Sequence, residues 1–389
     1  MKKIALLVLI HITACYFAQR KSTKTGRATL AELNMKSYEK DSTARALVLY
    51  EHANLYMETK KYDFQTDFYF RKKIFTKEGT DVATVKVITY GKERIKDILA
   101  VTYNLRENGS VEKTYLQKKD IFKNQLNEKY TETSFTLPNV KEGSVIEYVY
   151  SLISPYPSLD DLYFQSDIPK LQSDYDSAII GNYKYNARII GNPRLTKDNP
   201  SVLKKCIYIE GIGQAACAVR SFSMTDIPAF KEEDYMLSKK NYISRVAFDY
   251  VSYTDLRGGV RHYLNDWAAA DKSLKNDFLK NQSNKKNFFK KRLPESVLQI
   301  SNPLEKAKAI YSYIQENYTW NGKKRSSKNN KMRAVFEEKS GSVYDINLVL
   351  YNSLQAAEIE SYIAMVSTRN NGLPTKLYPI IADFNYLIV

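Results

Sequence analysis

The stretch Gly341-Ser-Val-Tyr-Asp345 predicts the start of a helix, and a mostly apolar run follows it to Ala357. Small polar residues are typical just before a helix. Asp345 would lie in the first turn, where a carboxylate complements the positive end of the helix dipole. We therefore expect a helix over 343–357, with the side chain of Tyr344 covering its surface.

A second helix is predicted upstream of the first. Asn302-Pro303 fits a helix start, because Asn caps a helix and Pro fits its first position. The helix should end before Trp320-Asn-Gly322. Its apolar face is predicted to consist of Ala307, Ile310, Tyr311 and Ile314. A charged helix is expected over 264–279, and two closing strands over 362–368 and 383–389.

The middle of the chain favours strands. Residues 44–252 follow period two more often than the helical period. Short strands separated by turn residues are typical of a sandwich or an open double sheet. Asn108-Gly109 predicts a hairpin turn of type I′, because both residues tolerate positive φ. The expected fold class is α+β and multidomain: an N-terminal antiparallel β-sandwich-like domain, a helical linker and an incomplete α+β core.

The amino end has the pattern of a secretory leader. Lys2 and Lys3 precede a mostly apolar run over 4–17, which is shorter than the ~20 residues that span a membrane. Cleavage after Ala18 would release a soluble protein. Ile12-Thr-Ala-Cys15 also resembles a lipoprotein signal, with Cys15 as the site of a lipid anchor. Both interpretations predict export to the periplasm, the outer membrane surface or the medium.

Cys206 and Cys217 flank Gly211-Ile-Gly213, and both flanking segments have the pattern of strands. In a hairpin centred between residues 211 and 212 the two cysteines would face each other. A disulfide could then close at a non-hydrogen-bonded pair in an oxidising compartment. The alternative is two small buried side chains without a bond.

The composition limits the classes of function. Of 389 residues 43% are hydrophobic, which excludes a disordered chain. Three cysteines and three histidines show no metal-ligand spacing, and no Gly-rich phosphate loop follows a strand. No metal and no cofactor are therefore expected. The net charge is +16, but no nucleic-acid-binding motif accompanies it. No segment after the leader is long and apolar enough for a transmembrane helix.

The order of the motifs resembles that of the transglutaminase-like fold, whose relatives include papain-type proteases. Over about 303–389 these motifs are Trp320-Asn-Gly322, Gly341-x-x-x-Asp345, Ser367-Thr-Arg369 and Phe384-Asn-Tyr386. Upstream, the chain resembles the β-rich domain of unknown function that precedes such cores in exported bacterial proteins. The resembling stretches are Asp41 to Tyr50, Phe135-Thr-Leu-Pro-Asn139 with Gly143-Ser-Val-Ile-Glu-Tyr148, Phe164-Gln165 with Ile168-Pro169, and Asp226-Ile-Pro-Ala229 with Glu233-Asp-Tyr235.

The resemblance implies a catalytic Cys at a helix N-terminus, a His on a neighbouring strand and an Asp that orients the His. In this sequence the Cys position falls on Val343 and the His position on Tyr386, and the third position would lie beyond Val389. Valine has no nucleophile, and a phenol with a pKa of about 10 is a poor base at neutral pH. We expect no catalytic residue and a binding pocket with the candidates Trp320, Ser342, Tyr344 and Asp345.

The expected organisation has five parts. They are a signal peptide over 1–18, an N-terminal extension over 19–43, a β-rich domain over 44–255, a helical linker over 256–302 and a partial transglutaminase-like core over 303–389. The apolar strand at the carboxyl end suggests a truncated copy or a fragment.

The expected function is that of a non-catalytic binding or scaffold module for a peptide, protein or glycan of the cell envelope. Nucleic acid is not an expected partner. Two alternatives stay open. One is an active acyl transferase or peptidase with an unorthodox nucleophile near Ser342. The other is a decayed gene fragment.

Overall fold

Strands dominate the first part of the chain and helices the last part in the computed structural model, which describes residues 25–192, 194–263, 266–279, 282–324 and 331–389. The chain divides into two compact units. The first comprises Met1–Tyr156, Ile168–Ile180 and Leu195–Pro228, and the second Pro157–Asp167, Gly181–Arg194 and Ala229–Val389. The leader and Cys15 lie outside the described residues. The domain boundaries expected at residues 44, 256 and 303 stay predictions.

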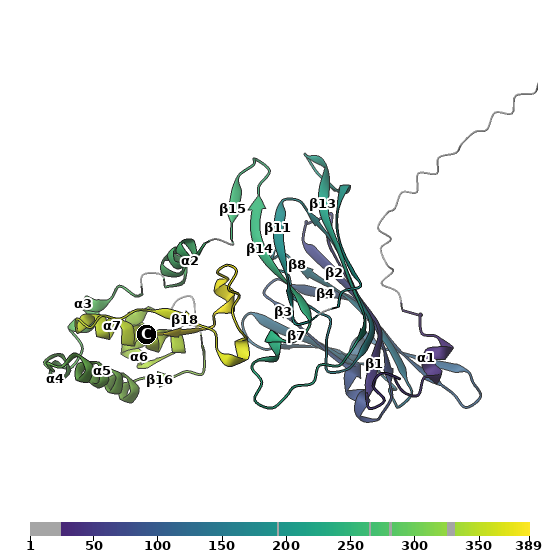
Figure 1. Cartoon of the computed structure of the whole chain (residues 1–389), viewed down its shortest axis with the longest axis horizontal. Coiled ribbons are helices and arrows are strands. Elements are labelled where there is room, and N and C mark those ends of the chain that lie inside the picture. The colour runs from purple at the N-terminus through teal and green to yellow at the C-terminus, as the bar shows by residue number, and fades with distance from the viewer. Residues whose placement is uncertain (1–24, 193, 264–265, 280–281, 325–330) are drawn as a thin grey trace, which may run out of the picture. The chain divides into compact units, whose positions relative to one another are not determined.

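The first unit is built on an eight-stranded sheet with the order β12-β13-β10-β1-β2-β8-β4-β5 (Figure 1). These strands are β1 Ala46–Met57, β2 Phe64–Ile74, β4 Arg94–Leu105, β5 Val111–Tyr115, β8 Val145–Ser154, β10 Lys170–Ile180, β12 Lys197–Ile209 and β13 Gly213–Ile227. All neighbours are antiparallel except β1 and β10, which run parallel. The predicted antiparallel sheet is confirmed apart from this pair, which alternation cannot reveal because its period is the same in both arrangements.

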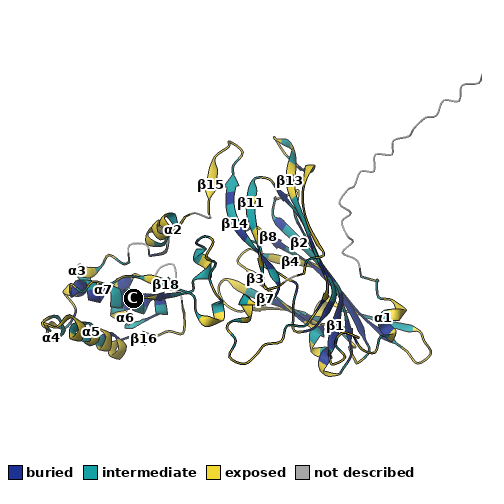
Figure 2. Cartoon of the chain, in the orientation of Figure 1, coloured by how far each residue is buried: buried dark blue, intermediate teal, exposed yellow. Residues whose placement is uncertain are grey.

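A three-stranded sheet, ordered β3-β7-β6, completes the sandwich-like arrangement. Its strands are β3 Thr84–Tyr90, β6 Ile121–Gln125 and β7 Tyr130–Thr136. Buried side chains from both sheets form one apolar core, among them Val48, Ile74, Val85, Phe135 and Ile146. Strand β8 is buried along nearly its whole length, as Figure 2 shows by the dark colour of the large sheet. Burial on both faces is expected of a central strand that lies between two covered faces of a sheet.

The segment that precedes β1 covers the other face of the large sheet. Helix α1, Leu30–Asn34, begins at Thr29 with a capping box that Glu32 completes. Leu33 packs in a core with Leu47 and Leu49, which alternate along β1 with the side chains of the sandwich core. Because successive side chains of a strand point to opposite faces, this second core lies on the opposite face of the sheet.

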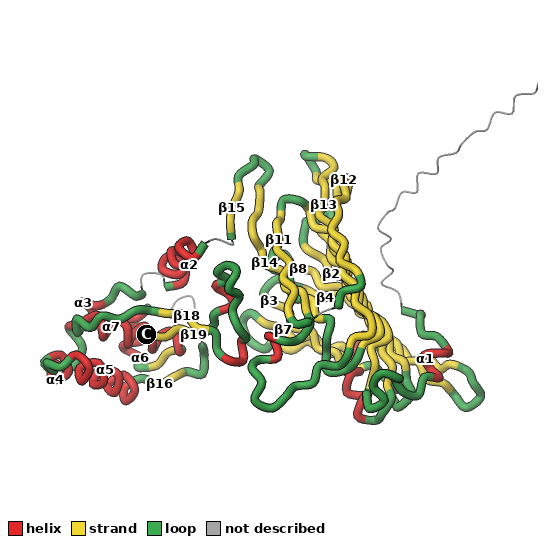
Figure 3. The backbone as a smooth tube through the Cα atoms, in the orientation of Figure 1, coloured by secondary structure: helices red, strands yellow, loops and turns green. Residues whose placement is uncertain are grey.

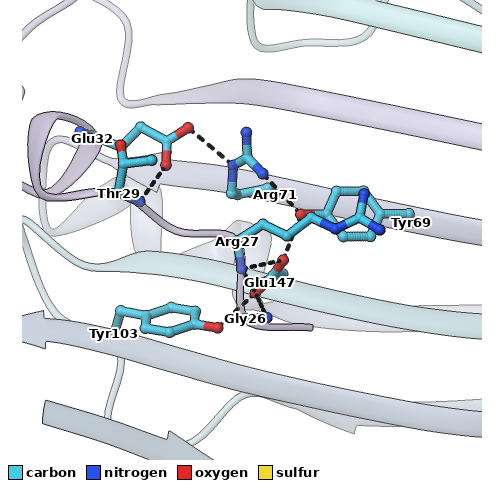
Figure 4. A network of polar contacts seen from close by, with 8 residues as sticks. All are labelled: Gly26, Arg27, Thr29, Glu32, Tyr69, Arg71, Tyr103 and Glu147. Atoms are coloured by element: carbon cyan, nitrogen blue, oxygen red, sulfur yellow. Dashed lines mark hydrogen bonds and ion pairs between the residues drawn. The ribbon is translucent and has the colours of Figure 1, made fainter. Parts of the chain in front are cut away.

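Glu147 on β8 fixes this segment to the sheet although its carboxylate is fully buried (Figure 4). Its Oε2 accepts hydrogen bonds from the Gly26 N–H at 2.7 Å and the Tyr103 hydroxyl at 2.6 Å. Its Oε1 accepts from the Tyr69 hydroxyl and, at 3.2 Å, from the Arg27 N–H. Hydrogen-bond donors from the segment before β1 and from the neighbouring strands β2 and β4 thus compensate the buried charge.

A second layer of contacts orients these donors. The Arg71 guanidinium donates to the Tyr69 hydroxyl at 2.9 Å and to Glu32 Oε1 at 3.0 Å. Burial, followed by the hydrogen bond to Glu147, raises the pKa of both Tyr69 and Tyr103. Both phenols therefore stay protonated and keep donating at neutral and mildly alkaline pH.

Replacing Glu147 by Gln should lower the free energy of unfolding by about 1–3 kcal/mol, because a buried amide NH2 would face donors and leave them unsatisfied. The measurement is urea unfolding of the variant and the wild type. The matched control is Glu107→Gln, at an exposed position on the β4–β5 turn. Equal stability of the two variants would contradict the assigned role of Glu147.

The second unit contains a small sheet ordered β11-β14-β15, with β9 also paired to β14. These strands are β9 Leu162–Tyr163, β11 Tyr183–Ile190, β14 Arg245–Thr254 and β15 Val260–His262. Two short strand pairs follow, β16 Thr319–Trp320 with β17 Ser340–Gly341 and β18 Ala364–Val366 with β19 Tyr386–Ile388. They form the α+β region together with the helices drawn in red in Figure 3.

The helices of this unit are α2 Trp267–Ser273, a π-helical turn Leu274–Phe278, α3 Lys286–Lys290, α4 Glu295–Leu298, α5 Pro303–Asn317, α6 Met332–Glu338 and α7 Val343–Ala356. Short 3-10 helices span Glu78–Ala83, Lys118–Asp120, Lys239–Asn241, Arg369–Asn371 and Ile381–Asp383. Among the residues that the structure describes, no helix is long and apolar enough to cross a membrane.

The start predicted for α5 is confirmed. Asn302 Oδ1 accepts hydrogen bonds from the N–H groups of Leu304 at 2.9 Å and Glu305 at 3.1 Å. Ile310 and Ile314 lie in the core of the second unit, as predicted. Tyr311 does not, because 57% of it is exposed. The 3.6-residue period placed it near the edge of the apolar face, and tertiary packing left that edge open.

Both hairpin predictions need correction in detail. Strands β4 and β5 do pair around the predicted turn, but of Asn108 and Gly109 only Gly109 has a positive φ, of 78°. A type I′ turn needs positive φ at both residues, so this turn type was wrong. The Asn108 side chain instead accepts from the N–H of Ser110 at 3.1 Å.

The cysteine hairpin has a different register from the predicted one. Cys206 and Cys217 are bonded, with their Cα atoms 5.6 Å apart. However, the strands pair Leu203 with Cys217 and Ile207 with Ala215, and the register shifts between these two pairs. Cys206 lies in that irregular stretch, so the bond closes across a bulge rather than between directly opposed residues.

Candidate functional site

The amino end of α7 is assembled from two segments that are about 20 residues apart in sequence. The short strands β16 and β17 run parallel and pair Trp320 with Gly341. The Asn321 N–H donates to the Gly341 carbonyl at 3.0 Å. Gly341 is required here, because a Cβ at this position would lie 2.8 Å from the Cβ of Asp345. The predicted site residues Trp320, Ser342 and Asp345 are thereby brought into one region.

Ser342 and Asp345 form a closed capping box. The Ser342 hydroxyl donates to Asp345 Oδ2 at 2.7 Å and accepts from the Asp345 N–H at 3.2 Å. The Ser342 N–H donates to the same carboxylate oxygen at 3.0 Å. Both residues are almost fully buried. The hydroxyl therefore stabilises the helix start, and its partner is a carboxylate rather than the imidazole that activates a serine nucleophile.

The next two N–H groups of the helix are also bonded. The Val343 N–H donates to the Lys323 carbonyl at 3.0 Å, and the Tyr344 N–H donates to the Lys324 carbonyl at 3.2 Å. Free N–H groups at a helix start are what stabilise a thiolate or an oxyanion. Here backbone carbonyls of the segment after Trp320 take the positions that such an anion would need.

Trp320 supports that segment. Its indole N–H donates to the Lys323 carbonyl at 2.8 Å, the same oxygen that accepts from Val343. More than half of the Trp320 side chain remains exposed. The residue thus holds the covering segment in place and offers an aromatic surface beside it.

Tyr344 was expected on the surface of the helix, and this was wrong. It is buried and packs in the core of the second unit with Leu348 and Leu387. Burial, followed by the nearby Asp345 charge, raises the pKa of Tyr344. As a neutral, buried phenol, Tyr344 serves packing rather than ligand contact.

Tyr386 lies on a strand attached to the same helix. Its strand β19 pairs with β18, opposite Val366. The Asn347 side chain of α7 donates to the Leu387 carbonyl at 3.0 Å, which holds β19 along the helix one turn after Val343. The helix that begins at Val343 and the strand that carries Tyr386 are therefore joined.

The loop between β18 and β19 is fixed by the residues that carried the sequence resemblance. The Thr368 N–H donates to Asn385 Oδ1 at 2.9 Å, and the Asn385 amide donates back to the Thr368 hydroxyl at 2.9 Å. Arg369 reaches the carbonyl oxygens of Tyr235 at 3.1 Å and Met236 at 2.6 Å. These motif residues hold backbone in place, which the sequence pattern alone did not indicate.

Lys339 is a feature that the sequence analysis missed. It ends α6 in the left-handed conformation, with φ 52°. Its ammonium group lies 3.9 Å from the centroid of the Phe336 ring and 4.7 Å from that of Tyr318. Burial lowers the pKa of Lys339. The aromatic residues of the preceding helices are the sequence feature that could have pointed to Lys339. However, whether their rings gather around its ammonium group depends on tertiary packing.

Among the described residues, no group of three His, Cys, Asp or Glu side chains is placed to hold a metal ion. The disulfide-bonded Cys206 and Cys217 belong to the first unit, whereas the Ser342–Asp345 region belongs to the second.

Comparison with known proteins identifies the second unit more closely. Residues 291–377 match the family model of the transglutaminase-like superfamily, and the chain therefore contains a transglutaminase-like domain after its β-rich part. No curated protein matches the sequence.

A solved structure shares the fold. A candidate protease from Parabacteroides distasonis ATCC 8503 aligns with a TM-score of 0.58 and 15% identity, over 88% of this chain and 64% of its own. This chain thus spans less than two thirds of that protein, and at this identity the likeness concerns the fold alone. Native yeast LTA4 hydrolase aligns with a TM-score of 0.26 and 9% identity, over 54% of this chain and 30% of its own, which is too low to carry an argument.

Substituting Ser342 by Ala should lower the free energy of unfolding by about 1–2 kcal/mol, because a helix cap is lost and the Asp345 carboxylate loses a donor. Thermal or urea unfolding measures the change. Ser340→Ala, two residues away and outside the capping box, should stay within about 0.5 kcal/mol of the wild type. If both variants were equally stable, Ser342 would not be acting as a cap.

A thiol introduced by Val343→Cys should remain unactivated. Because the N–H groups around it already bond to carbonyl oxygens, its alkylation by iodoacetamide should have a midpoint at or above pH ~8.5, the ordinary thiol value. The chain without its leader has no other free thiol, since Cys206 and Cys217 are bonded. Ser201→Cys on the exposed strand β12 is the control. A midpoint below pH ~7 for Cys at 343 alone would contradict this interpretation of the helix start.

Proposed function

We propose that this protein is an exported binding or scaffold module whose transglutaminase-like domain does not catalyse a reaction. The observation that carries the proposal is the state of the α7 start. The nucleophile position is Val343, and its N–H is bonded to the Lys323 carbonyl. A core without a nucleophile and with its N–H groups bonded can still present a shaped surface to a peptide, protein or glycan of the cell envelope.

The base position supports the same conclusion. Tyr386 is assigned to the position where the family has His, and a phenol is not the base that the family chemistry uses. A protonated phenol can donate a hydrogen bond, but it cannot accept the proton of a nucleophile. The pair of Val343 and Tyr386 is thus compatible with ligand binding and not with the proton transfer that the family chemistry needs.

Export is proposed from the leader pattern over 1–18, and the Cys206–Cys217 bond favours it, because disulfides persist in oxidising compartments. A lipid on Cys15 would place the protein on a membrane surface, whereas cleavage after Ala18 would release it. The intact mass of the mature chain distinguishes the two.

The alternatives receive less support. An unorthodox enzyme would need Ser342 as nucleophile, but its hydroxyl bonds to Asp345 at 2.7 Å inside a capping box. A decayed product would be expected to lose such details first, whereas the caps of α5 and α7 and the Glu147 network are intact.

The full chain without its leader should show no turnover of a γ-glutamyl donor with a primary amine and no cleavage of a peptide substrate pool. Its rates should equal those of Val343→Ala. The double variant Val343→Cys, Tyr386→His should stay inactive as well, since the carbonyl oxygens of Lys323 and Lys324 remain at the helix start.

One outcome would contradict this proposal, and a second would change its physical explanation. Turnover by the wild type that Ser342→Ala abolishes would make the protein an enzyme. Turnover that appears only in the double variant would mean that the segment around Lys323 leaves the helix start accessible, so that the two substitutions alone account for the lost activity.

A further inference from the structure

Three Asn-Gly pairs occur in the chain: Asn108-Gly109, Asn321-Gly322 and Asn371-Gly372. Asparagine is a thermolabile residue, because the backbone nitrogen of the next residue can attack the carbon of its side-chain amide. A following glycine leaves that nitrogen unshielded, since glycine has no Cβ. The sequence makes the three pairs equivalent, so a difference in their reactivity has to come from the structure.

The attacking nitrogen is unbonded at Asn321-Gly322. Asn321 is exposed and directly follows β16. Its Oδ1 accepts from the Lys323 N–H at 3.1 Å, and this Asx turn folds the side chain over the peptide bond to Gly322. No residue that the structure describes accepts from the Gly322 N–H. A Cβ added to Gly322 would have nothing within 4 Å, so the turn is open.

The pair Asn108-Gly109 is protected although its turn is of the same kind. Asn108 is also exposed, and its Oδ1 accepts from the Ser110 N–H at 3.1 Å. Here, however, the Gly109 N–H donates to the Arg106 carbonyl at 2.9 Å. The nitrogen would have to give up this bond before it could attack, so this pair is an internal control for the first one.

At Asn371-Gly372 both reacting groups are bonded. The Asn371 amide donates to the Ser367 hydroxyl oxygen at 2.9 Å and to the Asp383 carbonyl at 2.7 Å. The Gly372 N–H donates to the Arg369 carbonyl at 3.3 Å. The amide is thereby held away from attack, and the pair is protected on both sides of the reaction.

We propose that Asn321 is a site of spontaneous deamidation in the folded protein. Hydroxide removes the Gly322 N–H proton, the nitrogen bonds to Asn321 Cγ, and the side-chain nitrogen takes up a proton and leaves as ammonia. Water then opens the resulting succinimide ring at one of its two carbonyls, which leaves aspartate or isoaspartate at this position. One water is consumed for each ammonia released, so the conversion needs no cofactor and no oxidant.

Isoaspartate at position 321 should open the start of α7. The Asn321 N–H donates to the Gly341 carbonyl at 3.0 Å. Two residues later, the Lys323 carbonyl accepts from the Val343 N–H at 3.0 Å. Isoaspartate inserts a methylene into the backbone between these two bonds and lengthens it by about 1.5 Å. A displacement of this size breaks a hydrogen bond. The inference does not depend on whether the transglutaminase-like domain is catalytic.

The first experiment follows all three pairs in one sample. The full chain without its leader is incubated at mildly alkaline pH, and mass spectrometry of its tryptic peptides measures the conversion of each amide to an acid. Asn321 should convert at least tenfold faster than Asn108 and Asn371. In urea, where the turns are lost, the three rates should become similar. Equal rates in the folded protein, faster conversion of Asn108, or an advantage of Asn321 that persists in urea would overturn the proposal.

The second experiment measures amide exchange at Val343 and Tyr344. In protein that contains isoaspartate at position 321, both amides should exchange at least tenfold faster than in fresh protein. Asn321→Gln, whose longer side chain closes the cyclic imide far more slowly, should age without this change. Asn321→Asp, measured fresh, adds the charge without the methylene and should keep both amides protected.

Unchanged exchange in the isoaspartate-containing protein would overturn the assigned effect on α7. Fast exchange in fresh protein would overturn it as well, because the helix start would then have no bonds to lose. The conversion rate of Asn321 is measured independently of both results. Failure of the deamidation proposal can therefore be distinguished from an error in the hydrogen bonds assigned to the start of α7.

Discussion

The hydrogen bonds at the start of α7 decide what the second unit can do. An α-helix leaves its first N–H groups without partners inside the helix, and catalytic folds use those groups to hold an anion. In this protein Ser342 and Asp345 bond to each other in a capping box, and the carbonyls of Lys323 and Lys324 accept from the N–H groups of Val343 and Tyr344. Once these bonds are made, the N–H groups of Val343 and Tyr344 are no longer available to an anion.

The first unit also contains a buried polar group whose hydrogen bonds join distant segments. Glu147 is buried, and donors from the segment that precedes β1 and from neighbouring strands surround it. The gain from each bond is modest, but leaving one donor or acceptor unpaired in the interior would be costly. This asymmetry is what holds residues 25–35 against the sheet. In both units, buried polar atoms thus specify how distant segments meet, while the apolar cores supply most of the stability.

Local signals were predictable from the sequence, and long-range ones were not. The start of α5 at Asn302 and that of α7 at Ser342 depend on side chains within three residues, so both were found. Tyr311 and Tyr344 exchanged their expected roles, because periodicity cannot tell which edge of an apolar face its neighbours will cover. The parallel pairing of β1 with β10 and the bond from Val343 to Lys323 join segments without any local pattern. Likewise, the motif that contains Arg369 was visible in the sequence. Its hydrogen bonds to the carbonyl oxygens of Tyr235 and Met236 were not predictable, because these residues are more than 130 positions away.

The most direct test of the central claim is amide hydrogen exchange at Val343 and Tyr344, resolved by NMR in the full chain without its leader. If their N–H groups bond to Lys323 and Lys324, both should exchange at least ~100-fold more slowly than in an unstructured peptide, as hydrogen-bonded amides in packed structure do. Exchange of both amides at the rate of an unstructured peptide, while Ile346 in the same helix stays protected, would contradict the account. The helix start would then be open, and the proposal of a non-catalytic domain would rest on the missing Cys and His side chains alone.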